Sequence, residues 1–98
     1  MLLARVVGTV VATRKDPRLE GKKLIVIQPV SPEGKPEGGY IVAVDTVGAG
    51  NRELVLAVAG SSARMAEGCK DTPVDSAIIG IVDAVSLDEP LPPTAKKK

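Results

Sequence analysis

The chain has 98 residues, the length of one small domain, and its 13 basic and 12 acidic side chains leave a net charge of +1. Because the basic and acidic side chains nearly cancel, the protein has no broad electrostatic field that would attract a polyanion. Histidine, tryptophan and phenylalanine are absent and there is a single cysteine, which excludes an internal disulfide and leaves few side chains for catalysis.

The hydrophobic core must be aliphatic, because Tyr40 is the only aromatic residue in the sequence. Aromatic side chains supply much of the buried area in small domains, so a core of Val, Ile, Leu and Ala is thin and a partner subunit would help it. No apolar run approaches the roughly 18 residues of a membrane-spanning helix, and Arg5 interrupts the apolar start. We therefore expect a soluble cytoplasmic protein without a membrane partner.

Five β-strands are predicted from short apolar runs, several of which alternate. In the first run, every even-numbered residue is apolar or glycine, and Gly8 is expected to form a bend or bulge. The predicted strands lie at residues 2–13, 23–30, 40–46, 52–59 and 78–87.

Proline, glycine and polar residues mark the connections at 14–22, 29–39 and 48–50. Ser61 or Ser62 is expected to cap a short helix at 63–67 that Gly68 ends. Residues 72–75 (TPVD) are typical of one further helical turn. The tail at 88–98 is rich in proline and lysine, ends in three lysines and is expected to be disordered.

Five strands with a short helix before the last one predict an all-β domain over residues 1–87, either a small barrel or a closed sandwich. The second and fifth predicted strands are apolar on both faces. One face of a single small sheet should meet water, so this surplus apolar surface suggests a covering subunit.

Two glycine-rich segments bracket the fourth predicted strand. The first, residues 45–50 (DTVGAG), partly matches a dinucleotide-binding loop. Glu53 breaks the GxGxxG pattern, however, and a strand is predicted to follow in place of the required helix. We interpret it as a tight connection whose glycines supply positive φ. The second, residues 60–64 (GSSAR), offers serines without a histidine base, so a helix cap is favoured over a nucleophile.

The remaining candidates for chemistry are weak. Asp45, Asp75 and Asp83 could bind a hard cation, but we favour capping and ion pairing between subunits with Arg64 or Arg5. Cys69 is interpreted as an exposed loop thiol. We expect no catalytic residue, no metal and no cofactor.

The order of these segments resembles the EutN/CcmL family of bacterial microcompartment vertex proteins, which includes carboxysome vertex proteins. The resemblance runs from residue 1 to about 87 and is carried by residues 5–13 (RVVGTVVAT), 44–50 (VDTVGAG), 60–64 (GSSAR), 73–77 (PVDSA) and 79–83 (IGIVD). The pair DTVGAG and GSSAR at this spacing is specific, whereas either motif alone would be weak.

The resemblance implies a five-stranded barrel of OB-like shape, assembled as a homopentamer at the five-fold corners of a microcompartment shell in the cytoplasm. It implies hexameric shell proteins as partners and no enzymatic activity. The small residues of the two segments are then expected at the subunit contact or central opening: Gly48, Ala49, Gly50, Gly60, Ser61, Ser62, Ala63 and Arg64.

The alternative is an OB-type nucleic-acid-binding module. Barrels of this size often bind oligonucleotides, but single-strand binders stack bases on several aromatic residues in a basic groove. One tyrosine and a net charge of +1 fit that mode poorly. We therefore favour the vertex reading and expect no nucleic acid.

Overall fold

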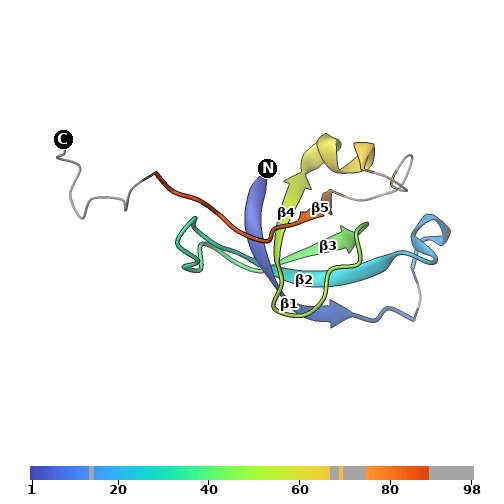
Figure 1. Cartoon of the computed structure of the whole chain (residues 1–98). Coiled ribbons are helices and arrows are strands. Elements are labelled where there is room, and N and C mark those ends of the chain that lie inside the picture. The colour runs from blue at the N-terminus through green and yellow to red at the C-terminus, as the bar shows by residue number, and fades with distance from the viewer. Residues whose placement is uncertain (14, 67–68, 70–74, 89–98) are drawn as a thin grey trace.

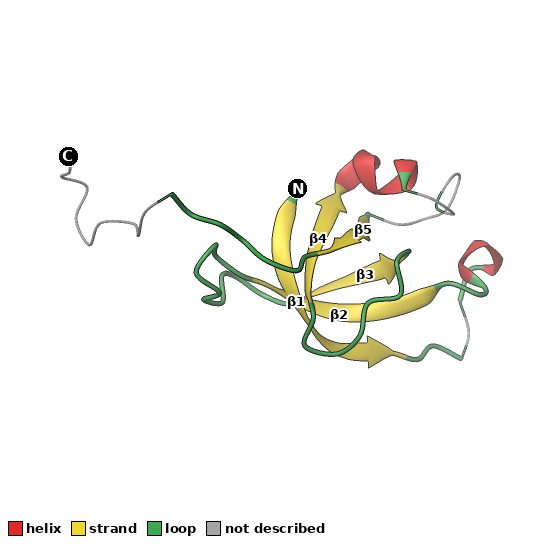
Figure 2. Cartoon of the chain, in the orientation of Figure 1, coloured by secondary structure: helices red, strands yellow, loops and turns green. Residues whose placement is uncertain are grey.

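The computed structural model describes residues 1–13, 15–66, 69 and 75–88. Within these residues the chain forms five strands and two short 3-10 helices: β1 (Leu2–Val10), η1 (Pro17–Leu19), β2 (Lys23–Pro29), β3 (Ile41–Asp45), β4 (Leu54–Ala59), η2 (Gly60–Met65) and β5 (Ser76–Ile81). The strands close into a barrel in the order β1-β2-β3-β5-β4, with η2 between the last two strands in sequence (Figures 1 and 2). Neighbours are antiparallel except β3 and β5, which are parallel. The predicted all-β class is confirmed, and of the two predicted architectures the barrel is found.

Strand β1 closes the barrel by pairing with both β2 and β4. Its register to β2 slips between Val6 and Gly8, so the predicted bulge at Gly8 is confirmed. Ala4 and Val6 are buried while Val7 is half exposed, as the predicted alternation requires. A bulge increases strand bending, which helps a short sheet to curl round and meet its own edge.

Two aliphatic clusters hold the subunit together. The first fills the barrel and consists of Ala4, Val6, Ile25, Ile27, Ala43, Ala49, Val55, Ala57 and Ile78. The second packs η2 and Cys69 against the outer face of the sheet and consists of Val44, Val58, Ala63, Cys69 and Ala77, with Leu19, Leu24, Ala66 and Ile79 beside them. Part of the surplus apolar surface is therefore covered within the subunit, while Val7, Val42 and Ile81 remain more than one-third exposed.

The predicted cap and helix before β5 are wrong in detail. The helix is a 3-10 helix that begins after Ala59, which makes no side-chain cap, and both candidate capping serines lie inside it. The predicted stop at Gly68 and residues 72–74 of the predicted turn lie outside the described residues, as do residues 89–98 of the tail. Cys69 is fully buried in the second cluster, so the prediction of an exposed thiol is wrong.

Strand ends also differ from the prediction. Strand β5 was expected to reach residue 87, but it ends at Ile81. The Val82 N–H donates to the Leu54 carbonyl at 2.8 Å, and Leu54 is the first residue of β4, so beyond it β5 has no ladder partner. The predicted loop at 14–22 contains η1, where Pro17 is the first helical residue and the Asp16 carboxylate accepts the Arg18 N–H.

Candidate subunit interface

The connection between β3 and β4 is organised by one buried carboxylate, Asp45. Its Oδ1 accepts the N–H groups of Val47 (3.0 Å) and Gly48 (3.1 Å), and its Oδ2 accepts that of Ala49 (2.8 Å). The Asp45 side chain is 0% exposed. Three donors converging on one carboxylate fix the loop that the sequence marks as DTVGAG, so the predicted capping role of Asp45 is confirmed.

Lys23 completes this arrangement. Its Nζ lies 3.5 Å from Asp45 Oδ2 and donates to the Ala49 carbonyl at 3.0 Å. The expected partners of Asp45 were Arg64 or Arg5 from another subunit, and within the subunit its partner is Lys23. Sequence reasoning missed Lys23, because no sequence motif links it to a carboxylate 22 residues away. The two residues meet because the β2–β3 register places them opposite each other.

Gly48 has a φ of 77°, which confirms the predicted positive φ at that residue. Gly50 does not share it; a Cβ there would lie 3.4 Å from Glu53 Oε1, which accepts the Gly50 N–H. Strand β4 follows directly, so the segment is a strand connection, and the dinucleotide-loop alternative lacks its helix.

The ends of this loop are fastened to the barrel. At its start, Thr46 Oγ1 donates to the Ile78 carbonyl of β5 at 2.7 Å. At its end, the Arg52 N–H donates to the Val6 carbonyl at 2.8 Å, and Arg5 donates to the Arg52 carbonyl at 2.7 Å. Hydrogen bonds to the barrel therefore hold the loop at both ends and define its surface.

The second predicted segment forms most of η2. Gly60 has a φ of 66°, and its N–H donates to the Asp75 carbonyl at 2.8 Å. Ser61, Ser62 and Arg64 are exposed, whereas Ala63 is fully buried beneath them. The buried alanine anchors η2 to the sheet and presents the other side chains outward.

Both predicted segments are hydrogen-bonded at β5 or at the residue before it, one from the side of β3 and the other from the side of β4. The β3–β4 loop reaches Ile78 from the β3 side, and Gly60 reaches the residue before β5 from the β4 side. Of the eight predicted interface residues, Ala49 and Ala63 belong to the subunit's own clusters and the other six are exposed. Of these eight, only those six are accessible to a neighbouring subunit.

The described residues contain no group of three or more His, Cys, Asp or Glu side chains placed to hold a metal ion. Asp75 and Asp83 are both exposed, and pairing of either with an arginine of another subunit stays a prediction. Over the same part of the chain, no helix has the length and apolar character needed to cross a membrane.

Comparison with known proteins gives one family. The family model described as "Ethanolamine utilisation protein EutN/carboxysome" matches residues 1–83. The chain is 47% identical to the carboxysome shell vertex protein CcmL of Synechocystis sp., over 89% of this chain and 87% of that protein. It is also 47% identical to the microcompartment shell vertex protein GrpN of Rhodospirillum rubrum, over 87% of this chain and 96% of the relative.

Solved structures agree. The structure of Gloeobacter violaceus CcmL superposes with a TM-score of 0.85 at 45% identity, covering 90% of this chain and 91% of that one. The structure of GrpN, described as a pentameric microcompartment shell protein from Rhodospirillum rubrum, superposes with a TM-score of 0.81 at 45% identity, covering 89% and 99%. Sequence and fold therefore agree over nearly the whole described barrel, and this chain belongs to the EutN/CcmL family of structural, non-enzymatic shell vertex proteins of bacterial microcompartments.

Proposed function

We propose that this chain assembles as a homopentamer that occupies the five-fold vertices of a microcompartment shell, next to hexameric shell proteins that tile the facets. The proposal is supported most directly by the likeness to GrpN, which is described as pentameric and is 45% identical over 89% of this chain. The mechanism is geometric. A layer of hexagonal tiles is flat, and replacing a six-fold tile by a five-fold one supplies the curvature that closes a shell.

A ring of five requires a heterologous contact, in which two different faces of the subunit match, and the ring closes because the rotation between subunits repeats five times. The exposed apolar residues support such a contact. Val7 and Val42 are each 50% exposed on the outside of the barrel, in a domain whose core is small and aliphatic. Covering such residues in an assembly adds about 25 cal/mol for each Å² of apolar area removed from water.

We further propose that the six exposed residues of the two glycine-rich segments lie at or near the subunit contact and the central opening. Three of their N–H groups have fixed acceptors, Gly48 on Asp45, Gly50 on Glu53 and Gly60 on the Asp75 carbonyl. The side chains of the six are small apart from that of Arg64. Small residues on a fixed backbone permit close approach of a second chain.

Ser62→Leu tests this placement better than a change at Gly48. Gly48 has a positive φ, so any side chain there strains its own subunit. Ser62 is exposed and has no positive φ. Loss of pentamers in Ser62→Leu with the subunit still folded supports the placement, whereas pentamers as stable as those of the unaltered chain would contradict it.

Shell closure tests the proposed function itself. Hexameric shell proteins are co-expressed with and without this chain, and the particles are imaged by electron microscopy. We expect closed polyhedral shells only when the chain is present, and open sheets or tubes without it. Closed shells at equal frequency in its absence would overturn the vertex role.

A further inference from the structure

The chain leaves the barrel after β5 as an extended segment, residues 83–88, which we name the C-terminal arm (Figures 1 and 2). The last hydrogen bond to the barrel is the one from the Val82 N–H to Leu54. Across the part of the chain that the structure describes, residues 83–88 make no hydrogen bond or ion pair, and all six are exposed. The subunit therefore does not use this segment to build its own sheet.

From Val85 onward the arm has the pattern of a strand with one apolar side, whereas Asp83 lies at the start of that same side. Val85 (40% exposed) and Leu87 (43% exposed) alternate with Ala84 and Ser86, and residues two apart lie on the same side of an extended chain. The two apolar side chains therefore face one way and lack full cover. Six extended residues span about 20 Å, slightly more than the five-residue length of β3.

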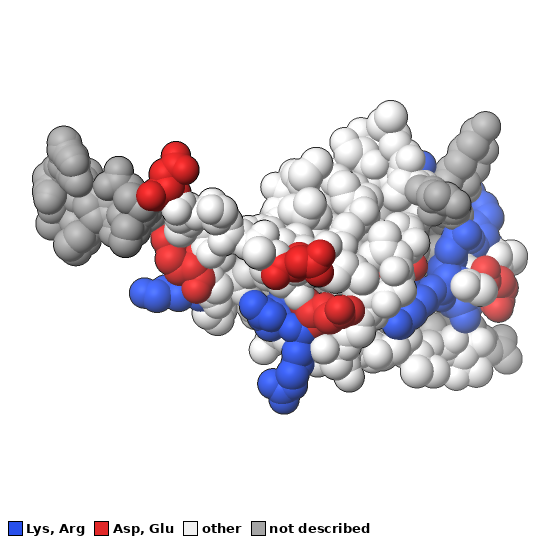
Figure 3. Space-filling view, in the orientation of Figure 1, with Lys and Arg blue, Asp and Glu red and all other residues white. Residues whose placement is uncertain are grey.

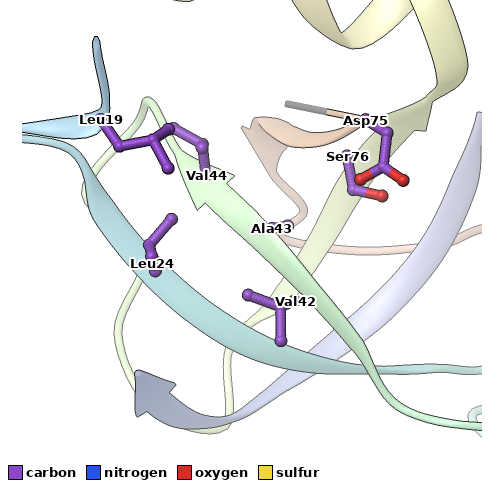
Figure 4. Close-up of a pocket in the computed structure, with 7 residues that line it drawn as sticks. All are labelled: Leu19, Leu24, Val42, Ala43, Val44, Asp75 and Ser76. Atoms are coloured by element: carbon purple, nitrogen blue, oxygen red, sulfur yellow. The ribbon is translucent and has the colours of Figure 1, made fainter. Parts of the chain in front are cut away.

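A groove of matching character lies on the barrel. It has a volume of about 220 Å³ and is lined by Leu19, Leu24, Val42, Ala43, Val44, Asp75 and Ser76 (Figure 4). We name it the β3 groove, because its floor is strand β3. Pockets for small molecules typically measure about 300–1,000 Å³, so this smaller, mostly aliphatic groove suits one or two side chains of a peptide.

Among the described residues, the backbone edge beside the groove is only partly paired. Strand β3 pairs with β2 along its whole length, from Ile41 to Asp45, but with β5 only at Val44 and Asp45. Among the described residues, the edge of β3 over 41–43 therefore has no strand partner on the β5 side. An open strand edge next to apolar pockets is the arrangement that accepts an extended peptide as an added strand.

One segment that borders the groove, at Leu19, is net positive, although the charged residue in the groove lining itself, Asp75, is acidic. Residues 14–23, which lead through η1 into β2, carry five basic and two acidic side chains. Both of those acids are already in ion pairs, Asp16 with Arg18 and Glu20 with Lys15. The arm carries Asp83 and Asp88 and no basic residue. Figure 3 shows Lys and Arg gathered at the end of the barrel that carries η1, with acidic side chains beside them, and side chains of both signs at the opposite end.

We infer that the C-terminal arm of one subunit docks in the β3 groove of the next subunit in the ring. Strand β5 begins at Ser76, beside the groove, and runs to Ile81, where the arm departs. Donor and acceptor thus lie at opposite ends of the same strand, so the arm points away from its own groove and towards a neighbour's. One contact of this kind repeated five times is heterologous and closes a ring. This inference rests on the pentamer proposed above.

The test compares ring dissociation on dilution, followed by native mass spectrometry, for two single substitutions on the arm. Val85→Asp places a charge on the docking side, and Ser86→Asp places the same charge on the other side, so Ser86→Asp is the matched control. We expect Val85→Asp to raise the subunit concentration at which the ring dissociates by about tenfold or more, as for a buried interface side chain. Ser86→Asp should change it by no more than about twofold.

A second variant acts from the groove side. Val42→Asp should weaken the ring as Val85→Asp does, and circular dichroism should show both subunits folded, because both positions are substantially exposed in the isolated subunit. Pentamers of unaltered strength in Val85→Asp and Val42→Asp would overturn the arm contact and leave the pentamer standing. An unaltered chain that forms no pentamer would overturn the proposed function instead.

Discussion

Removing the Asp45 carboxylate should loosen the β3–β4 loop and destabilise the subunit. In Asp45→Ala, the N–H groups of Val47 and Gly48 can turn to water because both residues are exposed, but Ala49 is 2% exposed and its N–H loses its partner in a buried site. An unsatisfied buried donor costs about 1–3 kcal/mol, and the lost charge-assisted bonds add to it, so we expect a loss of about 2–4 kcal/mol in the free energy of unfolding.

Asp45→Asn should be milder, at about 1–2 kcal/mol. The amide oxygen can still accept from Val47 and Gly48, but the amide NH₂ then faces two donors, the Ala49 N–H and Lys23. For a domain of this size, each 1 kcal/mol lowers the melting temperature by about 4–8 °C. The alanine variant should therefore melt roughly 10–30 °C below the unaltered chain.

The assay is urea unfolding followed by circular dichroism at one fixed protein concentration, since assembly makes apparent stability depend on concentration. Glu33→Ala is the control, because Glu33 is an exposed carboxylate in the β2–β3 connection and its loss should cost no more than about 0.5 kcal/mol. Amide exchange at residues 47–49 reports on the loop itself. If Asp45→Ala matches Glu33→Ala in stability and in exchange rates at 47–49, the reasoning about the loop is refuted.

Three further predictions follow from single residues. Gly60→Ala should cost about 1–2 kcal/mol in thermal unfolding because of its positive φ, whereas Gly39→Ala, where a Cβ also meets nothing within 4 Å, should be nearly neutral; equal effects would contradict the strain argument. Cys69 is buried, so thiol labelling in the native state should wait for opening of the structure, and labelling as fast as in urea would contradict its burial. The Arg18 guanidinium, through its side-chain hydrogen bond, lowers the pKa of Asp16 from 3.8 to about 2; its stabilising contribution is thus complete above pH 3.8 and is lost as the pH falls through about 2. Arg18→Gln should return this pKa towards 3.8 in a carboxyl NMR titration, and an unchanged value would reject the assignment.

The strands could be predicted from the sequence because apolar alternation is a local signal. Ala4 and Val6 of β1 do face the barrel interior as the alternation predicts, and the bulge lies at the glycine where it was expected. Beyond the bulge the alternation reverses, because Thr9 and not Val10 lies opposite the buried Ile25. Strand ends could not be predicted in the same way, since an end is set by the partner. β5 stops at Ile81 because β4 begins at Leu54, and nothing near residue 81 in the sequence records this.

The candidate site was predictable in position more than in detail. The glycine pattern located the β3–β4 loop and the positive φ of Gly48. The hydrogen bond from Lys23 to that loop depends on strand register, and the burial of Cys69 depends on packing against β3 and β4. Neither feature can be seen in the neighbouring sequence. The two serines were expected as caps, but the 3-10 helix already begins at Gly60, before either of them.

The native mass of the purified chain tests the central claim most directly. Native mass spectrometry across a range of protein and salt concentrations should show a species of five times the 10.1 kDa chain mass. That result would fit a ring closed by one repeated heterologous contact. A monomer or dimer that persists at every concentration would contradict the vertex account.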